Sequence, residues 1–311
     1  MVSEAAPRRG PRRALRRIVT LLALLVVGYF GISAYIASQL TLTNRRDISA
    51  NPAADGLPVE DVAFRSLRDD VTLRGWLLKA PADQGRVVVM VHGYNGVRDD
   101  RNSGMYPVAR SLIERNISVL LFDLRGCGQS EGERFSLGWF EQDDVRGALR
   151  FVRERGFRNI GLHGYSMGAA SGLLAAATDP AVKAMVEDSG YADLMDVLDQ
   201  EVPERSGLPP VFTPGIVLMA RLMYGIHADE VKPAEAAARF APRPLLVIHG
   251  DADQLIPVAN AGRIWRARYG EGEPDPATYY VVPGAGHTQA YKSDTAAYLA
   301  LVGGFFEEHL K

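Results

Sequence analysis

The sequence has 311 residues, of which 47% are hydrophobic and 23% are charged, and its formal net charge is −2. A chain of this length buries a core without disulfides or metals, and its one cysteine, Cys127, excludes an intrachain disulfide. The basic residues form no stripe on the globular part, so the charge distribution does not indicate a nucleic-acid partner. Length and composition indicate one large or two small globular domains.

The N-terminal segment predicts a membrane anchor. Residues 18–40 carry no charged side chain, and such a run is long enough as a helix to cross a hydrocarbon layer of about 30 Å. Arginines crowd segment 1–17 before it: Arg8, Arg9, Arg12, Arg13, Arg16 and Arg17. By the positive-inside rule, this basic segment stays in the cytoplasm. We therefore expect a single-pass membrane protein whose globular part is extracytoplasmic.

Three other interpretations of this segment compete with an uncleaved anchor. A cleaved signal peptide usually has a shorter apolar region, and small-residue cleavage pairs such as Gly31 and Ser33 are poor. The pair Arg16-Arg17 resembles a weak twin-arginine signal. The length of the run and its arginine flank disfavour a buried core helix. Residues 41–58 are polar and rich in turn formers, which predicts a linker.

From residue 59 onward, strand-like and helix-like segments alternate. Uniformly apolar or alternating runs predict strands at 59–66, 71–79, 86–91, 117–122, 159–163, 182–186, 245–249 and 278–282, the first two as an antiparallel pair. Helical patterns fill 106–115, 137–155, 167–177, 258–269 and 293–310. The repeated units predict an α/β domain over 59–311, with about eight mostly parallel strands and helices on both faces.

A proline-rich insertion at about 191–242 interrupts this alternation and contains one apolar stretch, 216–224. We expect the insertion to form a helical cap. Its apolar stretch has three open interpretations: it lines an acyl pocket, faces the membrane, or packs on the core.

The sequence Gly164-Tyr165-Ser166-Met167-Gly168 lies between a predicted strand and a predicted helix. A serine on so sharp a turn adopts strained backbone angles, and flanking glycines leave room for them. The hydroxyl is then lifted clear of the sheet. Ser166 is therefore the candidate nucleophile, because the motif occurs in the structural context that this chemistry needs.

Two backbone N–H groups are candidates for an oxyanion hole. The amide of Met167 begins the helix after the nucleophile, and helix N-termini favour developing negative charge. The turn His92-Gly93-Tyr94 follows the strand at 86–91 and can aim the amide of Tyr94 at the same point. For His92 itself we expect a structural role.

A base and an acid are expected on the later loops. His287 follows the last strand in the glycine-rich loop 283–287, whereas His163, His227 and His309 lie in a strand, in the insertion and in the C-terminal tail. Three carboxylates follow strands and could orient the base, namely Asp253, Asp251 and Asp188. The order serine, aspartate, histidine is that of the nucleophile-elbow enzymes.

Five motifs in order make the chain from about residue 59 resemble the α/β-hydrolase superfamily: HGYNG (92–96), DLRGCGQS (123–130), GYSMG (164–168), HGDADQLIP (249–257) and GAGH (284–287). Within it, the chain is most similar to bacterial membrane-anchored esterases and to serine aminopeptidase-like or prolyl-oligopeptidase-like hydrolases. The resemblance implies that Asp253 is the triad acid and that Tyr94 supplies an oxyanion donor. Cys127 departs from the usual pattern of its loop, so the role of that loop stays open.

These features predict a serine hydrolase that cleaves carboxylic esters or thioesters of a small-molecule acyl substrate. A serine peptidase using the same triad, with Asp193, Asp229 or Glu230 holding an amino terminus, is the alternative, and a binding protein without catalysis is the third hypothesis. Cys127 is a poor alternative nucleophile because no base is placed for it. No metal-ligand or phosphate-binding motif occurs, so no cofactor is expected. The sequence leaves the oligomeric state open.

Overall fold

The computed structural model describes residues 11–311, and residues 1–10, with Arg8 and Arg9 of the predicted basic segment, lie outside them. The described chain divides into two compact units. The helical unit comprises the residues up to Leu40 together with Asp199–Gly225. The sheet unit comprises Thr41–Leu198 and Ile226–Lys311.

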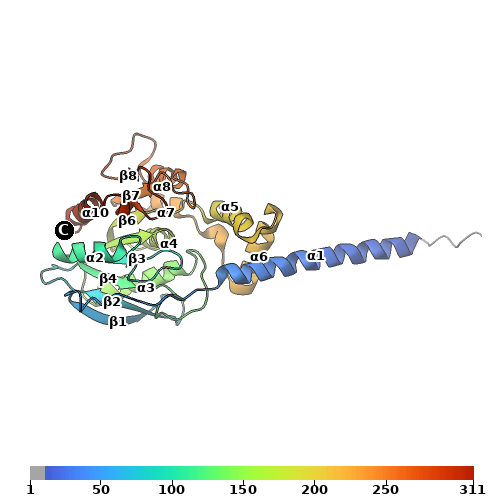
Figure 1. Cartoon of the computed structure of the whole chain (residues 1–311), viewed down its shortest axis with the longest axis horizontal. Coiled ribbons are helices and arrows are strands. Elements are labelled where there is room, and N and C mark those ends of the chain that lie inside the picture. Colours follow the sequence, from blue (N-terminus) through green and yellow to red (C-terminus); the bar gives the residue numbers. More distant parts are fainter. Residues whose placement is uncertain (1–10) are drawn as a thin grey trace, which may run out of the picture. The chain divides into compact units, whose positions relative to one another are not determined.

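The helical unit is built on α1 (Pro11–Thr41), which includes the apolar run predicted at 18–40 (Figure 1). The helix begins earlier than the apolar run because arginine and alanine are good helix formers. Within residues 11–311, α1 is the one continuous helix that is long and apolar enough to cross a membrane. The insertion contributes the end of α5 (Leu194–Ser206), the short η1 (Pro210–Phe212) and α6 (Thr213–Tyr224).

The sheet unit contains an eight-stranded sheet in the order β1-β2-β4-β3-β5-β6-β7-β8. Only β2 runs against its neighbours, so the predicted mostly parallel sheet with an antiparallel opening pair is confirmed. The strands are β1 (Val59–Arg65), β2 (Thr72–Leu78), β3 (Arg86–Val91), β4 (Ser118–Phe122), β5 (Asn159–Tyr165), β6 (Val182–Asp188), β7 (Leu245–Gly250) and β8 (Tyr279–Val282).

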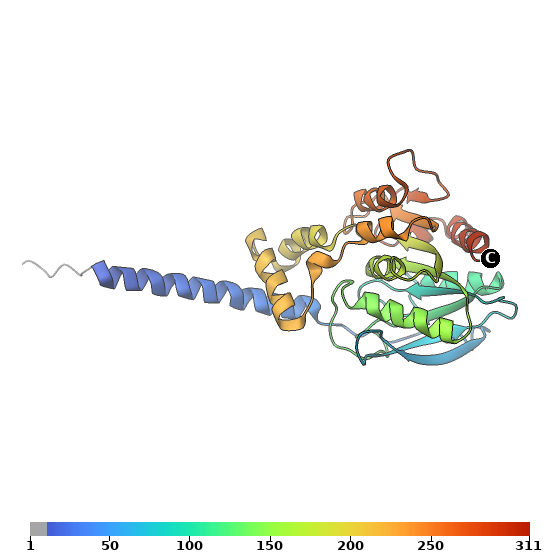
Figure 2. The ribbon, with the colours of Figure 1, turned by 180° about the vertical axis from the view of Figure 1, so that it is seen from behind.

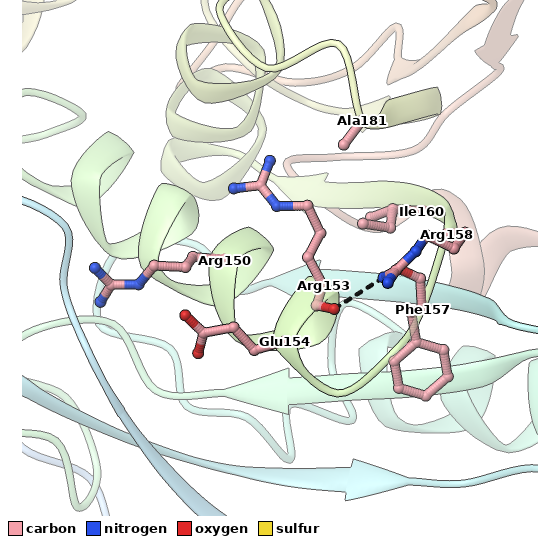
Figure 3. Close-up of a pocket in the computed structure, with 7 residues that line it drawn as sticks. All are labelled: Arg150, Arg153, Glu154, Phe157, Arg158, Ile160 and Ala181. Carbon is pink, nitrogen blue, oxygen red and sulfur yellow. Dashed lines mark hydrogen bonds between the residues drawn. The ribbon is translucent and has the colours of Figure 1, made fainter.

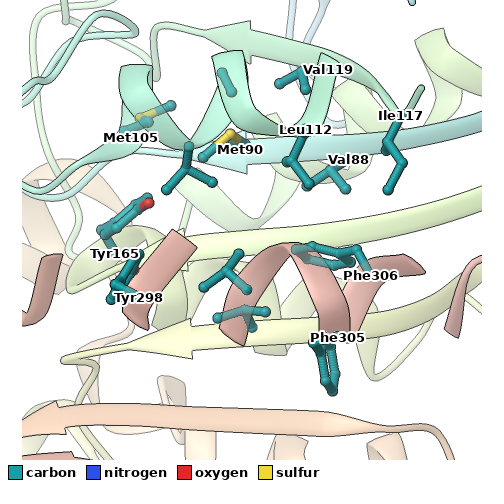
Figure 4. Close-up of a cluster of buried hydrophobic side chains, with 14 of the residues drawn as sticks. Val88, Met90, Met105, Leu112, Ile117, Val119, Tyr165, Tyr298, Phe305 and Phe306 are labelled. Carbon is teal, nitrogen blue, oxygen red and sulfur yellow. The ribbon is translucent and has the colours of Figure 1, made fainter. Parts of the chain in front are cut away.

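Helices cover both faces of this sheet, as predicted (Figures 1 and 2). One layer contains α2 (Met105–Glu114) and α10 (Thr295–His309), with the short α9 (Ala290–Ser293) before α10. The other contains α3 (Glu141–Glu154), α4 (Met167–Ala176), α7 (Pro233–Phe240) and α8 (Ala259–Tyr269), and the short η2 (Ala228–Glu230) precedes α7. Buried side chains of β3 and β4 meet those of α2 and α10 in one continuous core (Figure 4).

Helix α3 begins later than the prediction of 137–155. Leu137 and Gly138 have positive φ angles, which a helix does not accommodate. The carboxylate of Glu141 accepts hydrogen bonds from the Ser136 hydroxyl (2.6 Å) and from the Gly138 amide (2.8 Å). These bonds fold the preceding residues into a turn, so the helix starts at Glu141 itself.

The loop after β4 is a structural turn held by buried charges. Asp123 accepts hydrogen bonds from the amides of Arg98 (2.9 Å) and Gln129 (3.0 Å). The buried Arg125 donates to Asp144 (2.7 Å) on α3 and to Asp69 (2.9 Å) in the β1–β2 turn. Arg125 thereby ties three parts of the sheet unit together.

Residues 41–58 follow the surface of the sheet unit through specific contacts. The amide of Thr43 donates to Glu133 (3.2 Å), and the amide of Phe135 donates to Thr41 (2.7 Å). The Arg45 guanidinium donates to carbonyls of the loop after β4, including that of Ser130. Farther along, the Asp99 carboxylate accepts from the amide of Ser49 (2.7 Å). This segment lies against loops that follow β3 and β4.

Arg125→Met should destabilise the sheet unit by about 3–5 kcal/mol, because it leaves the buried carboxylate of Asp144 without its partner. Arg155→Met is the matched control, since Arg155 pairs with Glu60 at the surface and such pairs contribute about 0–1 kcal/mol. Denaturant unfolding of the purified protein in detergent measures both changes. Equal losses for the two variants would contradict the assigned role of Arg125.

Candidate active site

Ser166 lies on the sharp turn between β5 and α4, with φ of 52° and ψ of −118°. A serine at this φ is strained, and the neighbouring backbone holds it there. Its amide donates to the carbonyl of Asp188 (2.8 Å) on β6. A Cβ on Gly168 would lie 2.3 Å from the Val91 carbonyl oxygen, and one on Gly164 would lie 2.5 Å from Ala169 Cα. Glycine is therefore required on both sides of this turn.

The structure brings Ser166, His287 and Asp253 together from three separate loops. His287 Nε2 lies 2.9 Å from the Ser166 hydroxyl oxygen, and His287 Nδ1 lies 2.7 Å from Asp253 Oδ2. The loops that carry these residues follow β5, β8 and β7, so all three meet at the carboxyl edge of the parallel strands. A proton on Nδ1 leaves Nε2 free to accept the serine proton.

Asp253 is held as a carboxylate. Its Oδ1 accepts hydrogen bonds from the amides of Leu255 (3.0 Å) and Ile256 (2.9 Å). Burial opposes ionisation, but the hydrogen bonds from His249, His287 and Ile256 outweigh it and hold the pKa of Asp253 well below its usual range. The ionised carboxylate fixes the tautomer and the orientation of His287.

The other two candidate acids are engaged elsewhere. Asp188 accepts hydrogen bonds from the hydroxyls of Tyr298 (2.6 Å) and Ser189 (2.7 Å). Asp251 accepts from the amide of Gly284 (2.6 Å), at the start of the loop that carries His287. Of the three, it is Asp253 that contacts the His287 ring.

The loop after β3 approaches Ser166 closely. A Cβ on Gly93 would lie 3.3 Å from the Ser166 Cβ, so the Gly93-Tyr94 backbone lies beside the hydroxyl. Met167 is the first residue of α4, and the amide of a first helical residue has no acceptor within its helix. The two amides nominated from the sequence therefore come from segments that flank Ser166.

His92 has the structural position expected for it. Its ring is buried, its Nδ1 lies 2.8 Å from the Gly93 carbonyl, and its Nε2 accepts from the amide of Leu124 (3.0 Å). Burial lowers its pKa, so the ring stays neutral. His92 connects the loops after β3 and β4.

Comparison with known proteins assigns the chain to a protein family. The family model described as the alpha/beta hydrolase family matches residues 88–300. The chain belongs to this family. It is 28% identical over 247 residues to the uncharacterized protein YfhR of Escherichia coli K12, covering 76% of each chain. It is also 28% identical over 303 residues to the uncharacterized protein Rv2307c of Mycobacterium tuberculosis H37Rv, covering 94% of this chain and 96% of that protein.

The fold of the Pyrococcus furiosus esterase Pf2001 is similar. Its structure superposes with a TM-score of 0.69 at 21% identity, covering 87% of this chain and 99% of the esterase. At this identity the likeness concerns the fold, and it agrees with the α/β-hydrolase fold that the sequence motifs predicted.

Cys127 of this hydrolase is buried and is not placed as a nucleophile. Burial raises the pKa of its thiol, and the nearby carboxylates of Asp123 and Glu141 raise it further. A thiol with a raised pKa supplies little thiolate. Two other histidines contact groups outside the triad: His163 contacts Tyr298, and His227 pairs with Glu230.

An open hollow of about 450 Å³ lies at the opposite edge of the sheet (Figure 3). It is lined by α3, the turn after it, and the starts of β5 and β6. Its arginines are engaged: Arg153 pairs with Asp179 (2.7 Å), and Arg158 donates to the Arg153 carbonyl (2.9 Å). Within residues 11–311, no group of three or more His, Cys, Asp or Glu side chains could hold a metal ion.

Sequence reasoning missed the side chains behind the triad. Ser189 accepts from the amide of Thr288 (3.2 Å), which fixes the loop that carries His287. His249 Nε2 lies 3.2 Å from Asp253 Oδ2. Burial lowers the pKa of His249, but its bond to Asp253 and the carboxyl of Glu187 produce a net rise. His249 lies in the HGDADQLIP motif, yet motif matching assigns it no contact.

Glu187 is a buried acid behind the same loops. Its Oε1 accepts from the Gly190 amide, and its Oε2 has no hydrogen-bond partner among the described residues. Burial raises its pKa to about 7, although the charge of His249 opposes the rise. Folding therefore favours the protonated form of Glu187.

This raised pKa predicts a pH-dependent stability. Between pH of about 4.5 and 7, the folded protein keeps a proton on Glu187 that the unfolded chain releases, so stability falls as pH rises through this window. Glu187→Gln cannot ionise and should flatten the pH dependence of the thermal unfolding midpoint. Glu235→Gln, at an exposed position, is the control. Parallel curves for wild type and Glu187→Gln would show that Glu187 does not titrate as described.

Proposed function

We propose that this chain is a serine hydrolase that cleaves carboxylic ester or thioester bonds of a small acyl substrate. The observation that carries the proposal is the pair of hydrogen bonds from Ser166 to His287 (2.9 Å) and from His287 to Asp253 (2.7 Å), on a serine with strained backbone angles. The name of the fold neighbour from Pyrococcus furiosus, an esterase, is in line with this chemistry.

In the proposed mechanism, the Ser166 hydroxyl attacks the acyl carbonyl carbon while His287 Nε2 takes its proton. The amides of Met167 and Tyr94 stabilise the oxyanion of the tetrahedral intermediate. The imidazolium then gives its proton to the leaving alcohol or thiol, and the acyl group stays on Ser166. Water, activated by His287, attacks this acyl-enzyme and releases the acid. Asp253 stabilises the imidazolium in both halves.

Esters fit the described residues better than peptides do. A peptidase of the alternative kind needs unpaired acidic groups to hold the substrate's amino terminus. Glu230 pairs with His227 (2.8 Å), and Asp193 accepts from the amide of Met195 (2.9 Å). These acids of the insertion are committed to local contacts, so we place the peptidase second.

We further propose that α1 anchors the protein in a membrane, with the N-terminus in the cytoplasm and the sheet unit outside. The apolar run and its preceding arginines support this orientation. Contacts within the helical unit support an uncleaved anchor, because the buried Ser33 of α1 lies beside Gly215 and the Tyr29 hydroxyl donates to Val211. Removal of α1 as a signal peptide would leave those contacts without a partner.

A fluorophosphonate probe should label the full-length protein at Ser166, because the activated hydroxyl attacks phosphorus as it would attack an acyl carbon. Ser166→Ala should abolish the labelling, and Cys127→Ala should leave it intact. Asp253→Asn should slow it by about 10³–10⁴-fold, since the wrong tautomer of His287 is then favoured. Labelling followed by peptide mass spectrometry measures all three. Labelling that survives in Ser166→Ala would remove the proposed mechanism.

Substrate class is tested separately. The protein should hydrolyse nitrophenyl esters of short and medium acyl chains faster than aminoacyl nitroanilides, because Glu230 and Asp193, which could bind an α-ammonium group, are engaged in local contacts. Release of nitrophenol or nitroaniline is followed at matched concentrations, with Ser166→Ala as the blank. Faster hydrolysis of the anilides would favour the peptidase.

A further inference from the structure

Helix α6 packs against the C-terminal half of α1 within the helical unit (Figures 1 and 2). The Tyr29 hydroxyl donates to the Val211 carbonyl (2.8 Å), and the Tyr29 ring stacks on Phe212 with 5.0 Å between centroids. A Cβ on Gly215 would lie 2.6 Å from the hydroxyl oxygens of both Ser33 and Tyr29. The two helices therefore meet at van der Waals distance along a small-residue contact, as helices in membranes commonly do.

The other face of α6 is apolar and uncovered. Leu222 is 70% exposed, and Leu218, one helical turn earlier, is also exposed. Met223 and Val211 extend this surface at its two ends. We call Val211, Leu218, Leu222 and Met223 the apolar stripe. Arg221 is the one charged residue in α6, near its C-terminal end, where a long side chain reaches a polar surface.

The length of α1 before its contact with α6 sets the depth of that contact in a membrane. If Arg17 marks the cytoplasmic boundary, the part of the apolar run before the contact, residues 18–28, extends about 16 Å as a helix. This is about half of a hydrocarbon layer of roughly 30 Å. The rest of the apolar run, residues 29–40, completes the span and includes Tyr29 and Ser33, which η1 and the start of α6 contact. If α1 crosses the membrane, these residues lie in its outer half.

We propose that α6 is a second membrane-inserted element, which lies in the outer leaflet beside α1 with the apolar stripe against lipid acyl chains. The inference rests on the proposed anchoring by α1. Within the same unit, α1 also exposes large apolar side chains, Leu21 and Leu25 among them. In hydrocarbon the Tyr29 hydroxyl needs an acceptor, and the Val211 carbonyl supplies it.

The test uses the full-length protein with Cys127→Ala, reconstituted in phosphatidylcholine vesicles. Single cysteines replace Leu222 in the stripe, Leu25 in the anchor, or Glu154 on the exposed surface of α3, and each carries an environment-sensitive fluorophore. The emission of probes at Leu222→Cys and Leu25→Cys should be blue-shifted and quenched by acyl-chain-brominated lipid. The probe at Glu154→Cys should be quenched by aqueous iodide alone. Fluorophosphonate labelling of Ser166 reports that each variant is folded.

The outcomes separate this inference from its premise. Lipid quenching at Leu25 but iodide quenching at Leu222 would overturn the insertion of α6 and leave the anchor intact. Protection of Leu222 from both quenchers would also overturn it, and would indicate a second copy of the chain covering the stripe. Absence of lipid quenching at Leu25 would overturn the anchor and the inference together.

Discussion

The backbone turn at Ser166 is the constraint on which the candidate site depends. A non-glycine residue at φ of 52° costs of order 1–3 kcal/mol and persists only if its surroundings leave no alternative. Here the close approach of Gly168 to the carbonyl of Val91 brings α4 directly against the end of β3. The bond from the Ser166 amide to Asp188 fixes the other side. These contacts with the sheet therefore hold Ser166 in the strained conformation that exposes its hydroxyl to the site.

Hydrogen bonds within and between loops position the histidine and its acid. Asp253 accepts from two amides of its own loop and lies within reach of two imidazole rings. Ser189 holds the neighbour of His287. Together these bonds hold the His287 ring in one orientation. The lowered pKa of Asp253 keeps its carboxylate ionised opposite that ring at neutral pH.

The sequence predicted the strands well because buried parallel strands are continuous apolar runs, as at 86–91 and 118–122. It predicted the start of α3 poorly, since the turn at 136–140 depends on how the side chain of Glu141 folds back. Residue chemistry alone left three acids open at the site, because all three follow strands of the same sheet. Only the positions of the loops distinguish Asp253, which contacts His287, from Asp188, which contacts Tyr298.

The sequence predicted a helical insertion, but apart from the apolar stretch in α6 it did not predict where the individual helices begin and end. Prolines occur at several of their starts, at Pro210, Pro214 and Pro233, and there the fixed φ of proline favours a helix rather than breaking it. The exposed apolar face of α6 gives the same periodicity as a face packed on a core. The sequence therefore left core, pocket and membrane as equal interpretations.

Segment 41–58 makes more specific contacts near the candidate site than its polar composition suggests. Phe135 donates to the carbonyl of Thr41 and packs its ring against Tyr94 (4.7 Å between centroids), whose amide is a proposed oxyanion donor. Arg45 fixes the next turn of the segment to the loop after β4. Thr41, the first residue of the sheet unit, is therefore bonded to the same phenylalanine that packs against a proposed oxyanion residue. The start of the sheet unit is thus part of the packing that supports the loop after β3.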